Sequence, residues 1–134
     1  MQDENIEDEN DESENVQKIS MNTFLFWLPR ILSLLFIGFV SIFAFDVFGE
    51  YEGWELAAAL FIHFLPSLGL LAATVIAWRD DLFGAFAFFA FAAWYVWWAG
   101  LDRPLSWYLL IAVPATIVGI LYLLNWLLKQ RKTK

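Results

Sequence analysis

Four long apolar segments, separated by short polar breaks, make up most of the chain. They extend over residues 28–48, 54–78, 82–98 and 105–128. A helix rises about 1.5 Å per residue, so about 20 apolar residues cross the roughly 30 Å hydrocarbon layer of a bilayer. Because lipid offers the backbone no hydrogen-bonding partners, segments of this kind must be helical. The pattern predicts an all-α fold, a four-helix transmembrane bundle over residues 23–128.

The eight tryptophans and four tyrosines lie near the ends of these segments, whereas phenylalanine fills the interiors. An indole or phenol ring combines an apolar body with a polar edge, which favours the boundary between membrane and water. The aromatic pattern is therefore a second, independent indication of four membrane-crossing helices.

Composition separates this region from the amino-terminal segment. The chain is 60% apolar and 19% aromatic, above the usual share of a soluble domain. Residues 1–20 (MQDENIEDENDESENVQKIS) hold eight acidic residues and one lysine, which accounts for the whole formal charge of −7. A segment with so little apolar surface is expected to be disordered. We predict a disordered acidic tail over residues 1–22, serving as a spacer or as an arm that binds a partner.

The lysines and arginines predict the orientation of the bundle, because such residues are retained on the cytoplasmic side of short loops. With both termini in the cytoplasm, seven of the eight lie on that side and only Arg103 lies outside. Residues 129–134 (KQRKTK) then form a basic cytoplasmic tail. We expect a multi-pass protein of the cell membrane, the plasma or inner membrane, with both termini cytoplasmic.

A set of polar residues shares one face of the second predicted helix. At about 100° per residue they fall within an arc of about 120°, and Pro66 borders the same arc. A polar side chain in hydrocarbon costs a few kcal/mol unless it faces protein or water, so this face is expected to turn toward the bundle. Its members are Glu55, His63, Ser67 and Thr74.

His63, the only histidine, allows two interpretations. It either makes one interhelical hydrogen bond as a packing residue, or it serves as a proton relay or ligand contact. A metal site is not expected, because the chain has neither a second histidine nor a cysteine.

Charged residues near the helix ends form a second candidate group. Arg30 begins the first predicted helix and Asp46 ends it, while Asp80 and Asp81 lie in the turn before the third. We predict an ion pair between Arg30 and Asp80 or Asp81 that orients the bundle. Asp46 is either a hydrated carboxylate at the boundary or the partner of a residue at the same end, for which the candidates are Trp54, His63 and Arg103.

No catalytic motif was found, whether a glycine-rich phosphate loop, HExxH, a nucleophile elbow or an intramembrane protease pair. We therefore expect no enzymatic activity, no cofactor and no nucleic-acid partner. The third segment, LFGAFAFFAFAAWYVWW, interleaves phenylalanine with glycine and alanine. This favours close helix packing, although a slot for a quinone or a lipid is an alternative.

The runs LPRILSLLFIGFVSIFAFDVFG, IHFLPS and AWRDDLFGAF resemble small prokaryotic four-helix membrane proteins of an uncharacterised family, a domain of unknown function, over about residues 28–128. In size and helix number the chain is also similar to DoxX-like proteins and to small multidrug transporters. Those transporters carry a membrane-embedded glutamate in the first helix, whereas here the only acid of that helix is Asp46, at its outer end. The resemblance implies the four-helix fold but no particular activity.

Two hypotheses of function follow. The first is a non-enzymatic membrane component or accessory subunit, whose partners are the lipid bilayer and either a second copy or a larger membrane protein. The alternative is a small transporter or channel subunit that uses the polar face of the second helix.

Overall fold

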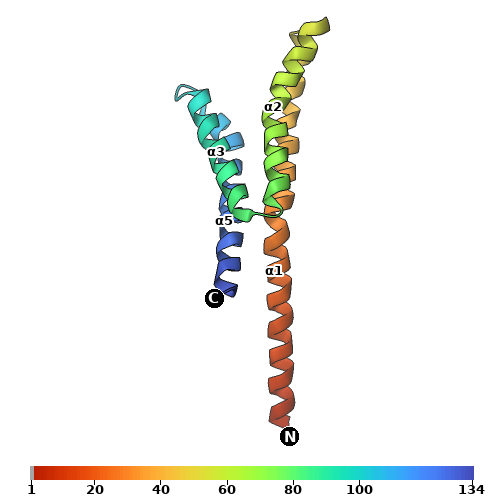
Figure 1. Cartoon of the computed structure of the whole chain (residues 1–134), viewed down its shortest axis with the longest axis vertical. Coiled ribbons are helices and arrows are strands. Elements are labelled where there is room, and N and C mark those ends of the chain that lie inside the picture. The colour runs from red at the N-terminus through yellow and green to blue at the C-terminus, as the bar shows by residue number, and fades with distance from the viewer. Residues whose placement is uncertain (1) are drawn as a thin grey trace.

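The computed structural model describes residues 2–134, with side chains from Ile6 onward, and within this range it contains helices and no strand (Figure 1). Four of its helical stretches are long and apolar enough to cross a membrane. The prediction of an all-α fold with four such helices is therefore confirmed. The elements in chain order are α1 (Gln2–Ile42), η1 (Phe43–Gly49), α2 (Gly53–Ala77), α3 (Asp81–Ala99), α4 (Leu105–Trp107), η2 (Tyr108–Ala112) and α5 (Val113–Lys132).

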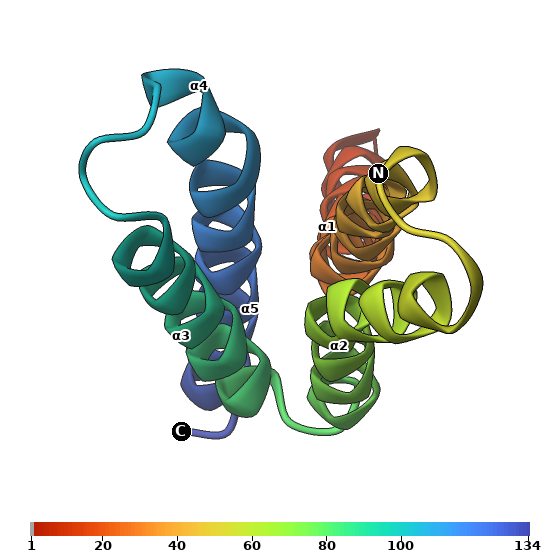
Figure 2. The same cartoon turned by 90° about the horizontal axis from the view of Figure 1, so that it is seen from above.

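The helices are arranged as two pairs, α1 beside α2 and α3 beside α5 (Figures 1 and 2). The pairs are joined by the turn at residues 78–80, and α1 also contacts α5 while α2 contacts α3. Away from this turn, α2 and α3 lean apart (Figure 1). We call the end of the bundle at this turn the closed end and the opposite end the open end. Both chain termini lie on the side of the closed end.

The acidic segment is helical from Gln2 and continues into the first apolar stretch, so the structure does not show the disorder predicted for residues 1–22. Glutamate, glutamine and lysine have good helix propensity, and acidic residues near a helix start interact favourably with its dipole. Extending an existing helix also avoids the cost of nucleation. This segment has few apolar side chains to pack against the bundle, and the side chains from Ile6 to Phe24 are all exposed.

The tightest packing joins α3 to its neighbours at two glycines. A Cβ atom added to Gly84 would lie 2.7 Å from the Cβ of Ala77 and 3.0 Å from the ring of Tyr122. One added to Gly119 would lie 2.9 Å from the ring of Phe89. Small residues of this kind let helix backbones approach closely in lipid, where no hydrophobic effect draws helices together.

The helix that begins at Leu105 contains a π-helical turn, η2, directly before Val113 and Pro114. Proline has no backbone N–H, so the carbonyl of Leu110 loses its usual donor. A wider turn at this point redistributes the backbone hydrogen bonds, and such π-turns are frequent at functional sites.

Candidate functional site

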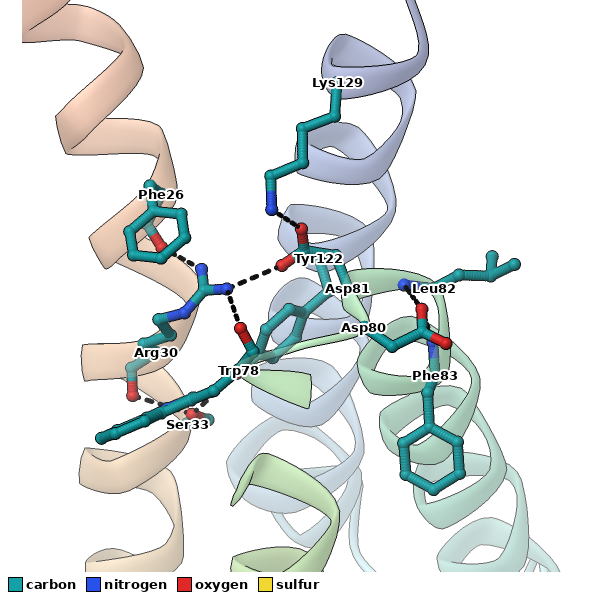
Figure 3. Close-up of polar contacts among 10 residues, drawn as sticks. All are labelled: Phe26, Arg30, Ser33, Trp78, Asp80, Asp81, Leu82, Phe83, Tyr122 and Lys129. Atoms are coloured by element: carbon teal, nitrogen blue, oxygen red, sulfur yellow. Dashed lines mark hydrogen bonds and ion pairs between the residues drawn. The ribbon is translucent and has the colours of Figure 1, made fainter. Parts of the chain in front are cut away.

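Three charged side chains meet at the closed end, and we call this group the charge clamp (Figure 3). Arg30 Nη2 donates a hydrogen bond to Asp81 Oδ1 at 3.0 Å, and Lys129 Nζ donates to Asp81 Oδ2. The side chains of Arg30 and Asp81 are each only 2% exposed, whereas that of Lys129 is half exposed. The charge clamp therefore joins α1, α3 and α5 through one buried carboxylate.

The guanidinium of Arg30 is further held by the backbone. It donates to the carbonyl of Phe26, one turn earlier in α1, and to the carbonyl of Trp78 at 3.3 Å. It also lies 3.6 Å above the centre of the Phe26 ring, which attracts a cation by its electron-rich face. The bond to Trp78 links α1 to the end of α2, so all four long helices contact this one site.

The two neighbouring aspartates have separate tasks. Asp81 pairs with Arg30, whereas Asp80 Oδ1 accepts hydrogen bonds from the backbone N–H groups of Leu82 at 3.0 Å and Phe83 at 3.2 Å (Figure 3). Asp80 is thus the N-cap of α3, which satisfies two donors that have no partner within the helix.

Lys129 was not predicted as a member of this site. A lysine at the end of the last helix is usually a topology signal. Lys129 lies seven residues after Tyr122, two helical turns on the same face, but this spacing does not show which helix that face meets.

A second polar contact lies next to the charge clamp. The hydroxyl of Ser33 donates to the carbonyl of Arg30 at 2.8 Å and lies 3.3 Å from the hydroxyl of Tyr122. Both side chains are fully buried, and the Tyr122 ring stacks on Phe88 with ring centres 5.9 Å apart. Polar and aromatic contacts together close this end of the bundle.

The predicted polar face of α2 is divided between two environments. Ser67 and Thr74 are buried, and the Thr74 hydroxyl donates to the carbonyl of Leu70, one turn earlier. Glu55 and His63, nearer the open end, are exposed. Within the described residues His63 makes no interhelical hydrogen bond. Its Nδ1 instead bonds to the carbonyl of Ala59 in the same helix at 2.8 Å.

Asp46 lies in η1 and is exposed. Among residues 6–134 it has no ion pair, and the interpretation as a hydrated carboxylate stays a prediction. Arg103, one of its suggested partners, instead lies 5.0 Å above the ring of Trp107.

A cavity of about 720 Å³ separates the two helix pairs on the open side of the charge clamp. We call it the interhelical groove. Its size is within the range of pockets that bind small molecules, and α3 supplies its aromatic wall. The lining residues are Val40 of α1; Ile62, His63, Leu65, Pro66, Gly69, Leu70 and Ala73 of α2; Ala87, Phe91, Trp94, Tyr95 and Trp98 of α3; and Ile111 of η2.

Comparison with known proteins gave one match. The model of a family described as a domain of unknown function (DUF7670) covers residues 17–134, which include all four apolar helices and the charge clamp. Neither a curated protein nor a solved structure matches the chain.

Proposed function

Because the chain belongs to the family described as a domain of unknown function (DUF7670), we propose its role from the structure. It is a non-enzymatic component of the cell membrane that crosses the bilayer four times and packs with a second copy or with a larger membrane protein. The likeness to DoxX-like proteins and a prokaryotic origin are part of the same proposal.

The observation that supports this role is the unequal burial of the four candidate spans. Only 17% of the α2 span is buried, against 28% of each of the others. Helices in lipid associate through close packing and polar contacts, so a helix that is less buried within its own chain has more surface available to another. The exposed apolar residues of α2 that lie outside the interhelical groove include Trp54, Phe61, Leu68 and Val75.

The charge clamp supports a structural rather than a catalytic role. A catalytic group must reach its substrate, whereas Arg30 and Asp81 are almost fully buried. Their charges and that of Lys129 are used to hold helices together. Such a site stabilises a membrane component without chemistry of its own.

The proposed orientation has both termini in the cytoplasm. The termini lie on the side of the closed end, and seven of the eight basic residues belong to that side by the order of the helices. The positive-inside tendency then places the closed end in the cytoplasm, where anionic lipid also attracts the basic carboxyl terminus.

Disulfide crosslinking in native membranes tests the association. The chain has no cysteine, so a single introduced cysteine reports on one position only. Phe61→Cys on the exposed side of α2 is expected to form a crosslinked dimer or a larger adduct. Phe86→Cys on α3, which is 72% exposed, is the matched control and is expected to remain mostly monomeric. Monomer alone at both positions would refute the association of two copies through this side of α2.

The alternative role, a small transporter or channel subunit, stays a prediction. It is favoured by the exposure of Glu55 and His63 on the face of α2 that also carries the buried Ser67 and Thr74. Flux through proteoliposomes that was unchanged by Glu55→Ala and His63→Ala would exclude these side chains from a transport path.

A further inference from the structure

The interhelical groove brings a histidine and two tryptophans to one level of the bundle. His63 lies fourteen residues before Ala77, the last residue of α2, and Trp94 lies thirteen residues after Asp81, the first of α3. Both are therefore roughly 20 Å from the turn that joins the helices, at about 1.5 Å per residue. Trp98 follows one turn further toward the open end. The three side chains line the same cavity.

The polar groups on the α2 side of the interhelical groove accept hydrogen bonds. A carbonyl oxygen can only accept, so the bond between His63 Nδ1 and the Ala59 carbonyl places the hydrogen on Nδ1. In the neutral ring Nε2 is then an acceptor, and no described side chain donates to it. Pro66 has no N–H and leaves the Ile62 carbonyl without its helical donor. Both residues line the interhelical groove.

The α3 side is a ladder of aromatic rings. The ring centres of Phe91 and Trp94 are 5.9 Å apart, and those of Trp94 and Trp98, which are stacked, are 6.2 Å apart. The faces of aromatic rings carry partial negative charge and attract cations, tryptophan most strongly. This attraction grows where water is excluded.

The open end of the molecule is also negatively charged. The loops and helix ends there hold five acidic residues and one basic residue, a formal charge of −4 (1 − 5). All six side chains are exposed, so their field attracts cations toward the membrane surface at this end. They are Asp46, Glu50, Glu52, Glu55, Asp102 and Arg103.

From this complementarity of charge we propose that the interhelical groove binds a lipophilic organic cation, a positively charged group carried on an apolar or aromatic body. The acidic open end attracts the charge, the rings of Trp94 and Trp98 hold it, and the aliphatic residues of α2 contact the apolar body. A donor on the ligand, where it has one, bonds to His63 Nε2. The site goes beyond the association proposed above and does not depend on it.

Two probes of equal shape and opposite charge test whether the interhelical groove selects a cation. Tetraphenylphosphonium and tetraphenylborate are each titrated onto the full chain in nanodiscs of neutral lipid, with empty nanodiscs as the reference for partitioning. The readout is the nitrogen NMR spectrum of labelled histidine, in which His63 gives the only signals. We expect a saturable shift with the cation and none with the anion.

Two neighbouring tryptophans provide the variant and its control. Trp94→Leu removes a ring from the wall and is expected to weaken binding of tetraphenylphosphonium about fivefold or more. Trp97→Leu changes an indole that is 78% exposed and does not line the interhelical groove, so affinity should be unchanged.

Three outcomes would overturn the proposal. Equal shifts with both probes would show a groove that selects only for apolar surface. Equal losses in the two variants would place the cation elsewhere. No shift with either probe would show a groove already filled, for example by a helix of another chain. If Trp94→Leu fails to fold, the comparison of the two probes on the unaltered chain still decides.

Discussion

The closed and open ends of the bundle are built from the same four apolar helices, yet they pack differently. At the closed end, the charge clamp and the contact between Ser33 and Tyr122 join α1, α3 and α5 to one another, and the bond from Arg30 to the Trp78 carbonyl adds the end of α2. At the open end, the interhelical groove lies between the pairs, and its one histidine bonds within its own helix.

This difference follows from the solvent. In water, apolar faces would associate along their whole length because association removes them from water. In a bilayer, lipid tails contact those faces equally well, so helices come together where polar bonds and small residues favour contact. The polar contacts therefore determine which end closes.

The largest expected effect comes from breaking the charge clamp. Asp81→Ala leaves the buried Arg30 without its counterion, and such a loss typically costs about 3–5 kcal/mol. We expect this decrease in the free energy of unfolding, measured by titrating bicelle-embedded protein with denaturing detergent. Asp102→Ala, an exposed acid at the open end, should change stability by less than about 0.5 kcal/mol. Similar losses in the two variants would show that the charge clamp does not distinguish the ends.

A pair of glycine substitutions should change stability in opposite directions. In Gly84→Ala the new Cβ meets Ala77 and Tyr122, and the overpacking should cost about 1–2 kcal/mol net of the gain in helix propensity. Gly69 lines the interhelical groove, and a Cβ there meets nothing within 4 Å. Gly69→Ala should therefore stabilise the protein by about 0.5–1 kcal/mol. The same detergent titration measures both, and equal signs would mean that the ends are packed alike.

Removing the cap of α3 separates capping from ion pairing at the closed end. Asp80→Ala loses two hydrogen bonds to backbone N–H groups and should destabilise the protein by about 1 kcal/mol. Asp80→Asn keeps the cap without the charge and should retain nearly all of the stability. If Asp80→Asn were as harmful as Asp80→Ala, the charge of Asp80 rather than its cap would matter.

The smallest expected effect concerns the contact between Ser33 and Tyr122. A hydrogen bond between membrane helices is worth about 0.6 kcal/mol on average. A double-mutant cycle of Ser33→Ala and Tyr122→Phe should give a coupling energy of about this size. A coupling energy of zero would assign closure to the charge clamp and the ring packing alone.

The sequence predicted much of the fold because its strongest signals are local. Hydropathy predicted four apolar helices, and three of the structure's elements, α2, α3 and the stretch from Leu105, begin within one residue of the predicted starts. Arg30 was predicted to pair with Asp80 or Asp81, the two aspartates of the short turn before the third helix. The pair found in the structure is one of these two.

The remaining features depend on contacts between distant segments. Lys129 joins the charge clamp only because α5 packs against α3, which helical periodicity within one segment does not reveal. His63 was assigned to a face that turns inward, but whether that face is covered depends on how far α2 leans from α3. Residues 2–22 are helical where a disordered tail was predicted, because helix propensity and continuity with the first apolar stretch outweighed the lack of apolar contacts.

Distance measurements between spin labels test the central claim, that the charge clamp holds the closed end together while the open end stands apart from it. Cysteines replace the exposed residues Ile31 and Leu127 at the closed end, or Leu65 and Val113 toward the open end, in a chain without other cysteines. Pulsed electron spin resonance in nanodiscs then gives each distance distribution with Asp81 and with Asp81→Asn. We predict that the closed-end distribution is narrow and broadens in the variant, while the open-end distribution does not change. A closed-end distribution that remained equally narrow without the carboxylate would contradict the claim.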